Sequence, residues 1–163
     1  MKALRNILIL LLIAAAGLNI ADAQTTKKDK KSTKEAYVKT RVDAKRYTFL
    51  ATYVLPQRGS GRQLTSEYDL RITPDSVVSF LPYFGRAYFD VPYGGGDGGM
   101  KFTSTKFTYE VKEKKKGGWE ISIKPADVKN IDRLLLNISS DGYVSLSINS
   151  TNRDFITFDG YLK

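Results

Sequence analysis

Hydrophobic and polar residues alternate along most of the chain after position 46, and a period of two is typical of β-strands with one face against a core. The alternation is clearest at Val144, Leu146 and Ile148, where polar residues stand between the apolar ones. Clusters of Gly, Pro, Asn and Asp separate the segments, as expected for turns. The pattern predicts strands over residues 47–55, 68–72, 77–81, 107–111, 119–123, 134–138, 144–148 and 155–162.

A helical pattern precedes these strands. Ser32 and Glu35 have the spacing of a capping box, in which the two side chains satisfy backbone N–H groups at the start of a helix. We therefore predict one short helix over residues 32–46. Its apolar face is thin, so we expect it to lie against the edge or end of a sheet.

Short strands at close spacing are typical of antiparallel sandwiches and barrels. Asp141 followed by Gly142 predicts a hairpin with a type I′ turn. The fold class is therefore predicted to be all-β: an antiparallel meander of about eight strands that forms a barrel-like or sandwich sheet, preceded by one short N-terminal helix. The pattern leaves closed barrel and sandwich open as alternatives, although closure would remove exposed strand edges.

The N-terminus has the layout of a secretory signal peptide. Two basic residues precede an apolar run over residues 7–20, and Ala21-Asp22-Ala23 matches a small-residue cleavage site. A membrane anchor is the alternative, but the run is shorter than the roughly 20 residues that span a bilayer. We expect cleavage after Ala23, a basic flexible tail over 24–31, one β-rich domain over 32–163, and no transmembrane span after cleavage. The protein is then periplasmic or secreted.

The positive charge is concentrated near the N-terminus. Nine of the 26 Lys and Arg residues lie between Lys27 and Arg46 against three acidic residues, whereas the chain from Tyr47 onward has 15 basic and 13 acidic residues. A short charged block beside an export signal is more often a solvated tail or helix than a binding arm. We therefore expect no nucleic-acid partner.

The chain contains no histidine and no cysteine. Serine and cysteine hydrolase triads, and zinc, haem and iron–sulfur sites, depend on these residues. Without cysteine there is also no disulfide and no lipid attachment of the lipoprotein type. What the composition leaves open is carboxylate chemistry: paired acids for glycoside hydrolysis, or an oxygen-ligand site for calcium. Because no spacing indicates either, we predict no catalytic residues, no cofactor and no metal site.

The segment from Leu81 to Gly99 fits no regular element, because it combines aromatic residues, prolines and glycines. Long loops in compact domains are often functional, and aromatic rings can stack on a sugar or contact an acyl chain while an arginine binds an anion. Equally, the rings can cap the end of the sheet core, which is the commoner role of aromatic residues. The candidate ligand-binding residues are Tyr83, Phe84, Arg86, Tyr88 and Tyr93.

Three stretches carry a resemblance to a known family. They are YDLRITPDSVVSFLPYFGRAYF, the later KFTSTKFTYE, and the C-terminal DGYVSLSINSTNRDFITFDGYL. With the signal peptide, they resemble the domain of unknown function family 4251 (DUF4251), small exported proteins of Gram-negative bacteria, over about Tyr37 to Leu162. The resemblance implies an exported β-rich domain. It implies no activity, because the family has no assigned catalytic residue, cofactor or ligand.

Three functions follow as hypotheses. The first is a non-enzymatic envelope protein that binds a small molecule, a glycan or an envelope protein through the aromatic segment, which predicts an open apolar cavity beside the rings. The second is a structural or protein-interaction module of the periplasm, which predicts an exposed apolar patch or an unpaired sheet edge. The third is a carboxylate-based hydrolase, ranked last because no spacing indicates a pair of acids.

Overall fold

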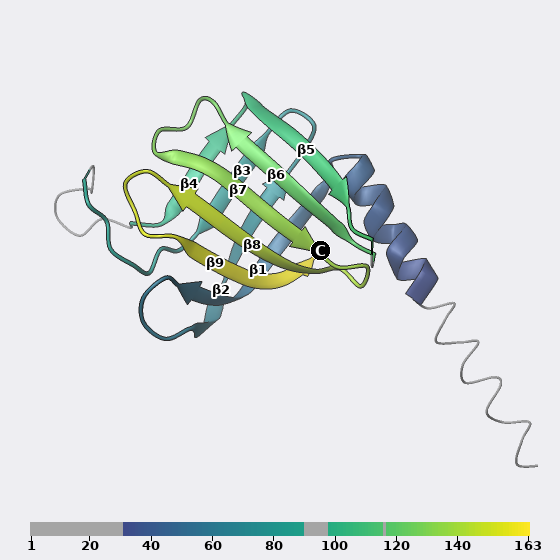
Figure 1. Ribbon diagram of the computed structural model, residues 1–163, viewed down its shortest axis with the longest axis horizontal. Helices are drawn as coiled ribbons and strands as arrows, with labels where there is room; N and C mark the ends of the chain where they lie inside the picture. The colour runs from purple at the N-terminus through teal and green to yellow at the C-terminus, as the bar shows by residue number, and fades with distance from the viewer. Residues whose placement is uncertain (1–30, 90–97, 116) are drawn as a thin grey trace, which may run out of the picture.

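The computed structural model describes residues 31–89, 98–115 and 117–163. Within them, nine antiparallel strands form one sheet in the order β4-β3-β2-β1-β9-β8-β7-β6-β5, which curls into a nearly closed barrel (Figure 1). All strand neighbours are consecutive in the chain except β1 and β9. The strands are β1 Tyr47–Pro56, β2 Arg62–Ile72, β3 Val77–Leu81, β4 Met100–Ser104, β5 Phe107–Glu113, β6 Trp119–Pro125, β7 Ile131–Ile138, β8 Tyr143–Ser150 and β9 Ile156–Leu162.

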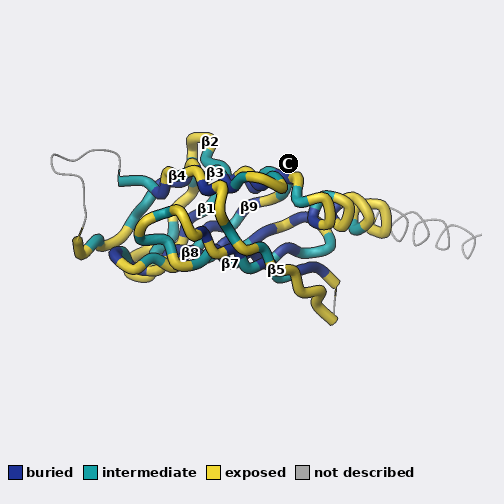
Figure 2. Tube along the Cα trace, turned by 90° about the horizontal axis from the view of Figure 1, so that it is seen from above, coloured by how far each residue is buried: buried dark blue, intermediate teal, exposed yellow. Residues whose placement is uncertain are grey.

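The predicted alternation separates the inside of this sheet from its outside. In β8, Val144, Leu146 and Ile148 are buried, whereas Ser145 and Ser147 between them are partly accessible. Figure 2 shows the buried positions between the two sides of the curled sheet. The fully buried large side chains that fill this interior are Phe49, Phe158, Leu70, Ile72, Leu81, Ile121, Ile123, Leu134, Leu136, Ile138, Leu146 and Ile148.

The pairing of β1 with β9 joins the first strand to the last. A bulge between Ala51 and Tyr53 interrupts its register, and Gly160 lies opposite Ala51. A Cβ atom on Gly160 would lie 1.9 Å from the backbone oxygen of Leu50 and 2.9 Å from the Phe49 ring. Only a residue without a side chain permits β9 to approach β1 this closely.

The N-terminal helix covers one end of the barrel, at the right of Figure 1. It is described over residues 31–43, with a turn at 44–45, so it ends three residues before the predicted boundary and already includes Ser32, the expected N-cap. Two of its own residues, Val38 and Val42, are buried and belong to the core cluster. Its placement at an end of the sheet is as predicted.

Two tyrosines connect β1 to β5 near the helix. The hydroxyl groups of Tyr47 and Tyr109 are 2.9 Å apart, and the Lys45 ammonium lies 5.0 Å from the centre of the Tyr109 ring. Burial raises the pKa of Tyr109 to about 12. Both hydroxyls therefore stay protonated at neutral pH, and the hydrogen bond between them is retained.

The sheet does not close by backbone pairing, because β4 and β5 are its two edges. Asp127, from the connection between β6 and β7, binds the turn that joins these edges. Its carboxylate accepts hydrogen bonds from the Ser104 hydroxyl and from the backbone N–H groups of Thr105 (2.8 Å) and Lys106 (3.1 Å). These bonds to the ionised form lower the pKa of Asp127 to about 2.

Two local predictions are corrected by the structure. Met100–Ser104 forms a ninth strand that the pattern did not indicate, because it is short and follows a glycine-rich stretch. The hairpin at Asp141-Gly142 exists, but among the described non-glycine residues only Lys45 and Asn130 have positive φ. Asp141 therefore does not adopt the conformation of a type I′ turn. The turn is instead a wider loop, in which Ser139 pairs with Tyr143 and only Gly142 has positive φ.

Gly160→Val is expected to destabilise the fold severely. The new side chain would overlap the Leu50 carbonyl, a backbone group that cannot rotate away, so the free energy of unfolding should fall by about 3 kcal/mol. Urea unfolding followed by circular dichroism measures the change. Ser122→Ala, on the outer side of β6, is the matched control and should change stability by less than about 0.5 kcal/mol. Equal midpoints for the two variants would show that the close approach of β9 to β1 is not required.

The Asp127 contacts predict an acid-dependent loss of stability. The folded-state pKa is depressed, so the stabilisation is complete above the unfolded-state value near 4 and is lost as the pH falls from about 4 to about 2. The Tm difference between the wild type and Asp127→Asn should therefore be largest at neutral pH and shrink towards zero at pH 2. A difference that stays constant over this range would contradict the assignment.

Candidate functional site

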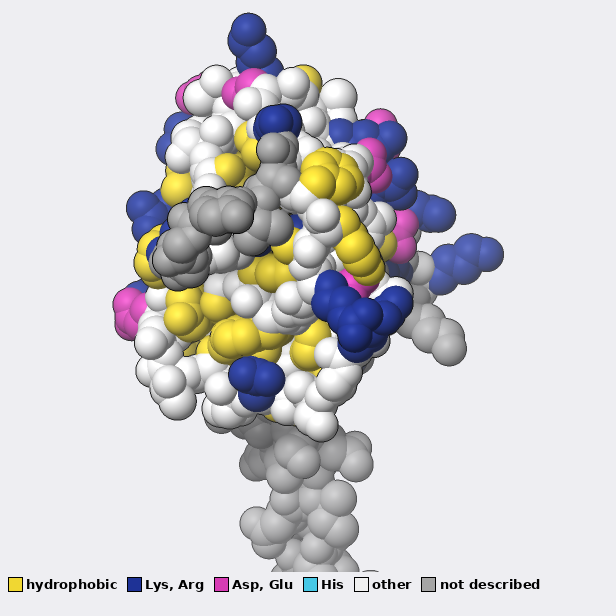
Figure 3. Space-filling view, turned by 90° about the vertical axis from the view of Figure 1, so that its left-hand side faces the viewer, with side chains coloured by type: hydrophobic (Ala, Val, Ile, Leu, Met, Phe, Trp, Pro, Cys, Tyr) yellow, Lys and Arg dark blue, Asp and Glu magenta, His cyan; other side chains and the backbone are white. Residues whose placement is uncertain are grey.

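The end of the barrel away from the helix carries the aromatic segment. Figure 3 shows hydrophobic side chains gathered in the middle of this face, with Lys and Arg side chains around them. The segment leaves β3 and runs beside the loop that connects β8 to β9. There the Tyr88 N–H donates to the Asn152 carbonyl (2.9 Å), and the Asp154 N–H donates to the Arg86 carbonyl (3.0 Å). Residues 86–88 therefore form a short additional pairing that fixes their backbone.

Tyr83 and Phe84 pack inward. Both are half-buried against the core cluster, and the Arg62 guanidinium lies 4.6 Å from the centre of the Phe84 ring. The Tyr83 hydroxyl lies 2.7 Å from the Arg86 carbonyl and 3.1 Å from the Asp154 carbonyl, to which it can donate its proton. Burial is the main reason why the pKa of Tyr83 is raised. For these two residues the contacts favour the alternative that aromatic rings cap the core.

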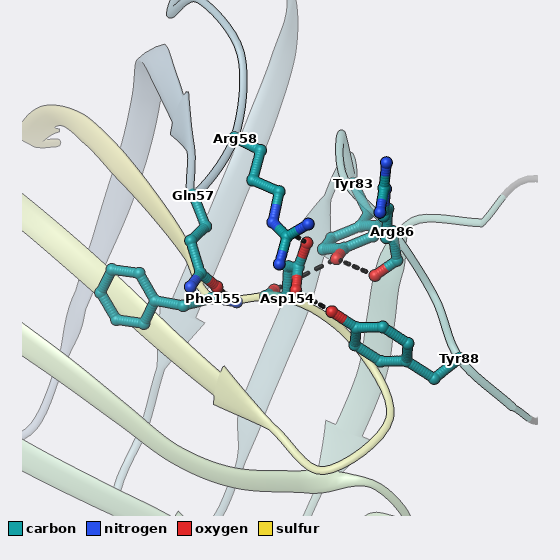
Figure 4. Close-up of polar contacts among 7 residues, drawn as sticks. All are labelled: Gln57, Arg58, Tyr83, Arg86, Tyr88, Asp154 and Phe155. Atoms are coloured by element: carbon teal, nitrogen blue, oxygen red, sulfur yellow. Dashed lines mark hydrogen bonds and ion pairs between the residues drawn. The ribbon is translucent and has the colours of Figure 1, made fainter.

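Tyr88 and Phe89 are different, because their side chains are 60% and 54% exposed. The Tyr88 hydroxyl donates to Oδ1 of Asp154, and this hydrogen bond is the main reason why the pKa of Tyr88 is raised. The positive charges of Arg58 and Arg86 act in the opposite direction and favour a lower pKa for the same hydroxyl. Tyr88 therefore has an accessible ring whose hydroxyl end is anchored (Figure 4).

Asp154 is the acidic group at the centre of this cluster, and it is only 7% exposed. Its Oδ2 atom lies 3.7 Å from Nε of Arg58, too far for a hydrogen bond, and finds no hydrogen-bond partner among the described residues. A buried carboxylate oxygen without a donor is costly. The Oδ2 atom of Asp154 can therefore accept a hydrogen bond from water or from a ligand.

Asn152 holds the next part of the segment. This buried side chain donates from Nδ2 to the Phe89 carbonyl (2.9 Å) and accepts from the Ser150 hydroxyl (2.8 Å). Arg153 donates to the Gly98 carbonyl, and its guanidinium lies 4.9 Å from the centre of the Tyr83 ring. The loop between β8 and β9 therefore holds both described ends of the aromatic segment.

The structure brings four of the five predicted candidates together and leaves the fifth untested. Tyr83, Phe84, Arg86 and Tyr88 lie at one end of the barrel; Tyr93 lies outside the described residues. Sequence reasoning missed Arg58 and Asp154, which come from two other loops. No local signal marks either residue, since their proximity depends on the pairing of β1 with β9.

A cleft of about 140 Å³ lies between β4 and residues 128–131 and shares Asn152 and Arg153 with the cluster. It is smaller than most small-molecule sites, which occupy about 300–1,000 Å³. It is lined by none of the four described candidates, Tyr83, Phe84, Arg86 and Tyr88. The described part of this end therefore differs from the open apolar cavity that the binding hypothesis predicted: the exposed rings form a surface rather than the wall of a pocket.

The same part of the chain provides little for metal or acid–base chemistry. No group of three or more acidic residues gathers within the described residues in a way that could hold a metal ion. In the buried Asp154 carboxylate, Oδ1 accepts a hydrogen bond from Tyr88, and Oδ2 lies 3.7 Å from Nε of Arg58. The arrangement is suited to holding a surface in a fixed shape and to contacting a ligand with aromatic rings and guanidinium groups.

Asp154→Ala should loosen this end of the barrel. The substitution removes the acceptor for the Tyr88 hydroxyl and the partner of Arg58, both exposed enough to bind water instead, so we expect a loss of about 0.5–1.5 kcal/mol in the free energy of unfolding. Urea unfolding measures it. Asp132→Ala, which removes an exposed acid in β7, should stay within about 0.5 kcal/mol of the wild type. The central role of Asp154 would be refuted by equal stability of the two variants.

Comparison with known proteins places the chain in a family. In the described residues, no helix has the length and apolar character needed to cross a membrane. No curated protein matches the sequence. A solved structure, the crystal structure of a DUF4251 family protein from Bacteroides eggerthii DSM 20697, is similar with a TM-score of 0.56 and 17% identity, over 80% of this chain and 87% of the other. The family model for the domain of unknown function DUF4251 matches residues 29–162, and the chain therefore belongs to the DUF4251 family.

Proposed function

We propose that the protein is a non-enzymatic binding protein of the bacterial envelope, with its site on the exposed face formed by Tyr88, Phe89, Arg58 and Arg86. The ligand has a flat or apolar face and an anionic group. The observation that carries this proposal is the anchored ring of Tyr88, which is 60% exposed although its hydroxyl is bound to the buried Asp154.

The physical argument concerns pre-organisation. A ring that is already fixed loses little conformational freedom when a ligand stacks on it, so more of the contact energy is available for binding. The Phe89 ring beside it is also exposed, and its backbone is fixed by Asn152. A binding surface needs accessible side chains on a backbone that is held in place, and both conditions are met here.

The charge of this face supports an anionic group on the ligand. Arg58 and Arg86 are exposed, and the positive charge of each favours a lower pKa for the Tyr88 hydroxyl, so both lie near it. The Asp154 carboxylate is buried beneath them and offsets only part of their charge. Guanidinium groups bind carboxylates and phosphates through paired hydrogen bonds.

The N-terminal sequence pattern supports a location in the envelope. A signal peptide cleaved after Ala23 would place the domain in the periplasm or outside the cell, without a lipid anchor. Ligands available there include small molecules, glycans and envelope proteins. The absence of histidine and cysteine from the sequence supports a role without catalysis.

A structural or protein-interaction module is the second candidate, supported by the unpaired edges β4 and β5. However, β5 carries three exposed charged side chains, Glu110, Lys112 and Glu113. Charged side chains on an edge strand are a common way to prevent another strand from adding to it. This protection makes the aromatic face the better candidate.

The test is native mass spectrometry of the protein exported with its own leader. The wild type should carry a reproducible bound mass, and Phe89→Ala and Arg86→Ala should each reduce its occupancy about tenfold, since each removes a ring or a charge from the surface. Neither side chain forms a hydrogen bond or ion pair within the described residues, so both variants should keep the wild-type Tm.

Tyr37→Ala is the matched control, because Tyr37 is an exposed aromatic residue on the helix at the other end of the barrel. It should retain the bound mass. A wild-type protein without a bound molecule, or equal occupancy in all three variants, would refute the proposal.

A further inference from the structure

A second aromatic surface lies on the outer side of the sheet, away from the residues of the proposed site. Tyr143 in β8 and Tyr161 in β9 are directly opposite each other in the antiparallel register. Their side chains are 70% and 42% exposed. Residues in such positions have Cβ atoms about 4.5–5.5 Å apart, so the two rings can act as one platform.

A hollow of about 390 Å³ adjoins these rings. Its volume falls within the range of about 300–1,000 Å³ that is usual for small-molecule sites. The hollow is open, and backbone from Val144 and Gly160 forms part of its lining. Its polar side chains are Thr52, Asn137, Ser139, Ser145 and Asp159.

The register places three of these polar residues in one row. Asp159 pairs with Ser145, and Ser145 pairs with Asn137, so the row crosses β9, β8 and β7. It runs parallel to the tyrosine pair and is displaced from it by two residues along each strand, about 7 Å. A ligand lying across the strands can therefore contact the rings and the polar row together.

The hollow depends on the same irregularities that join β1 to β9. The bulge in β1 shifts the register between Ala51 and Tyr53, and Gly160 lets the two strands approach closely. Thr52, the residue within the bulge, donates its hydroxyl proton to the Asp159 carbonyl at 3.2 Å. The lining is thus fixed by backbone geometry and does not depend on long flexible side chains.

The chemistry of the lining is specific. The side chains of Asn137, Ser145 and Asp159 form no hydrogen bond or ion pair with any described residue, and no Lys or Arg lines the hollow. The groups that face a ligand are one carboxylate, one amide and hydroxyls. An anion would meet Asp159 without a compensating cation, and an acyl chain would cover unpaired polar groups at a cost.

We infer that this hollow is a binding site for a neutral sugar ring of an oligosaccharide. The two tyrosine rings contact the C–H face of the pyranose. The Asp159 carboxylate accepts hydrogen bonds from sugar hydroxyls, while the Asn137 amide both donates and accepts. This site shares no residue with the face around Tyr88, so it stands or fails independently of the proposed function.

The experiment is an NMR titration of the exported, processed protein with maltohexaose, cellohexaose, xylohexaose and mannohexaose. At least one should shift the amide signals of residues 137–145 and 159–161 in a saturable manner. Tyr143→Ala should weaken that binding about tenfold, and Asp159→Asn about fivefold. Tyr143 is 70% exposed and Asp159 has no partner to lose, so both variants should keep the wild-type Tm.

Tyr37→Ala is the matched control, an exposed aromatic residue on the helix and outside the hollow, and should bind the sugar as the wild type does. Hexagalacturonate, an anionic oligosaccharide, is the negative probe. Binding of no neutral probe, unchanged affinity in Tyr143→Ala, or preference for hexagalacturonate would each overturn the inference. Loss of sugar binding in Phe89→Ala would also overturn it, because the sugar would then occupy the other face.

Discussion

The pairing of β1 with β9 is the interaction on which the rest of the structure depends. Every other pair of neighbouring strands is consecutive in the chain, and all of these pairs except β3–β4, which the segment 82–99 connects, have short connections. Without the β1–β9 pairing, the sheet would be two separate meanders of four and five strands. Because this contact joins residues about 110 positions apart, its formation must overcome the largest loop-closure entropy in the sheet. The close approach at Gly160 makes the contact specific.

The same pairing builds the candidate site. Its last paired residues are Pro56 and Ile156. Directly beyond them, the Gln57 N–H donates to the Phe155 carbonyl (3.1 Å), and Arg58 comes within 3.7 Å of Asp154. The site is therefore a continuation of the β1–β9 ladder past the end of the sheet. A change of register there would separate Arg58 from Asp154.

Sequence reasoning was successful where the physics is local. Alternation identified eight of the nine strands, and the choice of an all-β fold is confirmed, because burial of one strand face produces a period of two. It missed Met100–Ser104 and assigned the wrong turn at Asp141, where a wider loop replaces the two-residue turn. It could not find Asp154 as the partner of Arg58 and Tyr88, because contacts between segments far apart in the chain leave no local pattern.

The distribution of charge on the sheet separates protected surfaces from available ones. The unpaired edge β5 carries exposed Lys and Glu side chains, the usual protection against association. The outer face around Tyr143 and Tyr161 has no lysine or arginine in its hollow. A cross-strand aromatic pair on a solvent-exposed face adds only about 0.2–1 kcal/mol to the stability of a sheet. Most of the area of the two tyrosine rings is therefore available for contact with a ligand rather than committed to the fold.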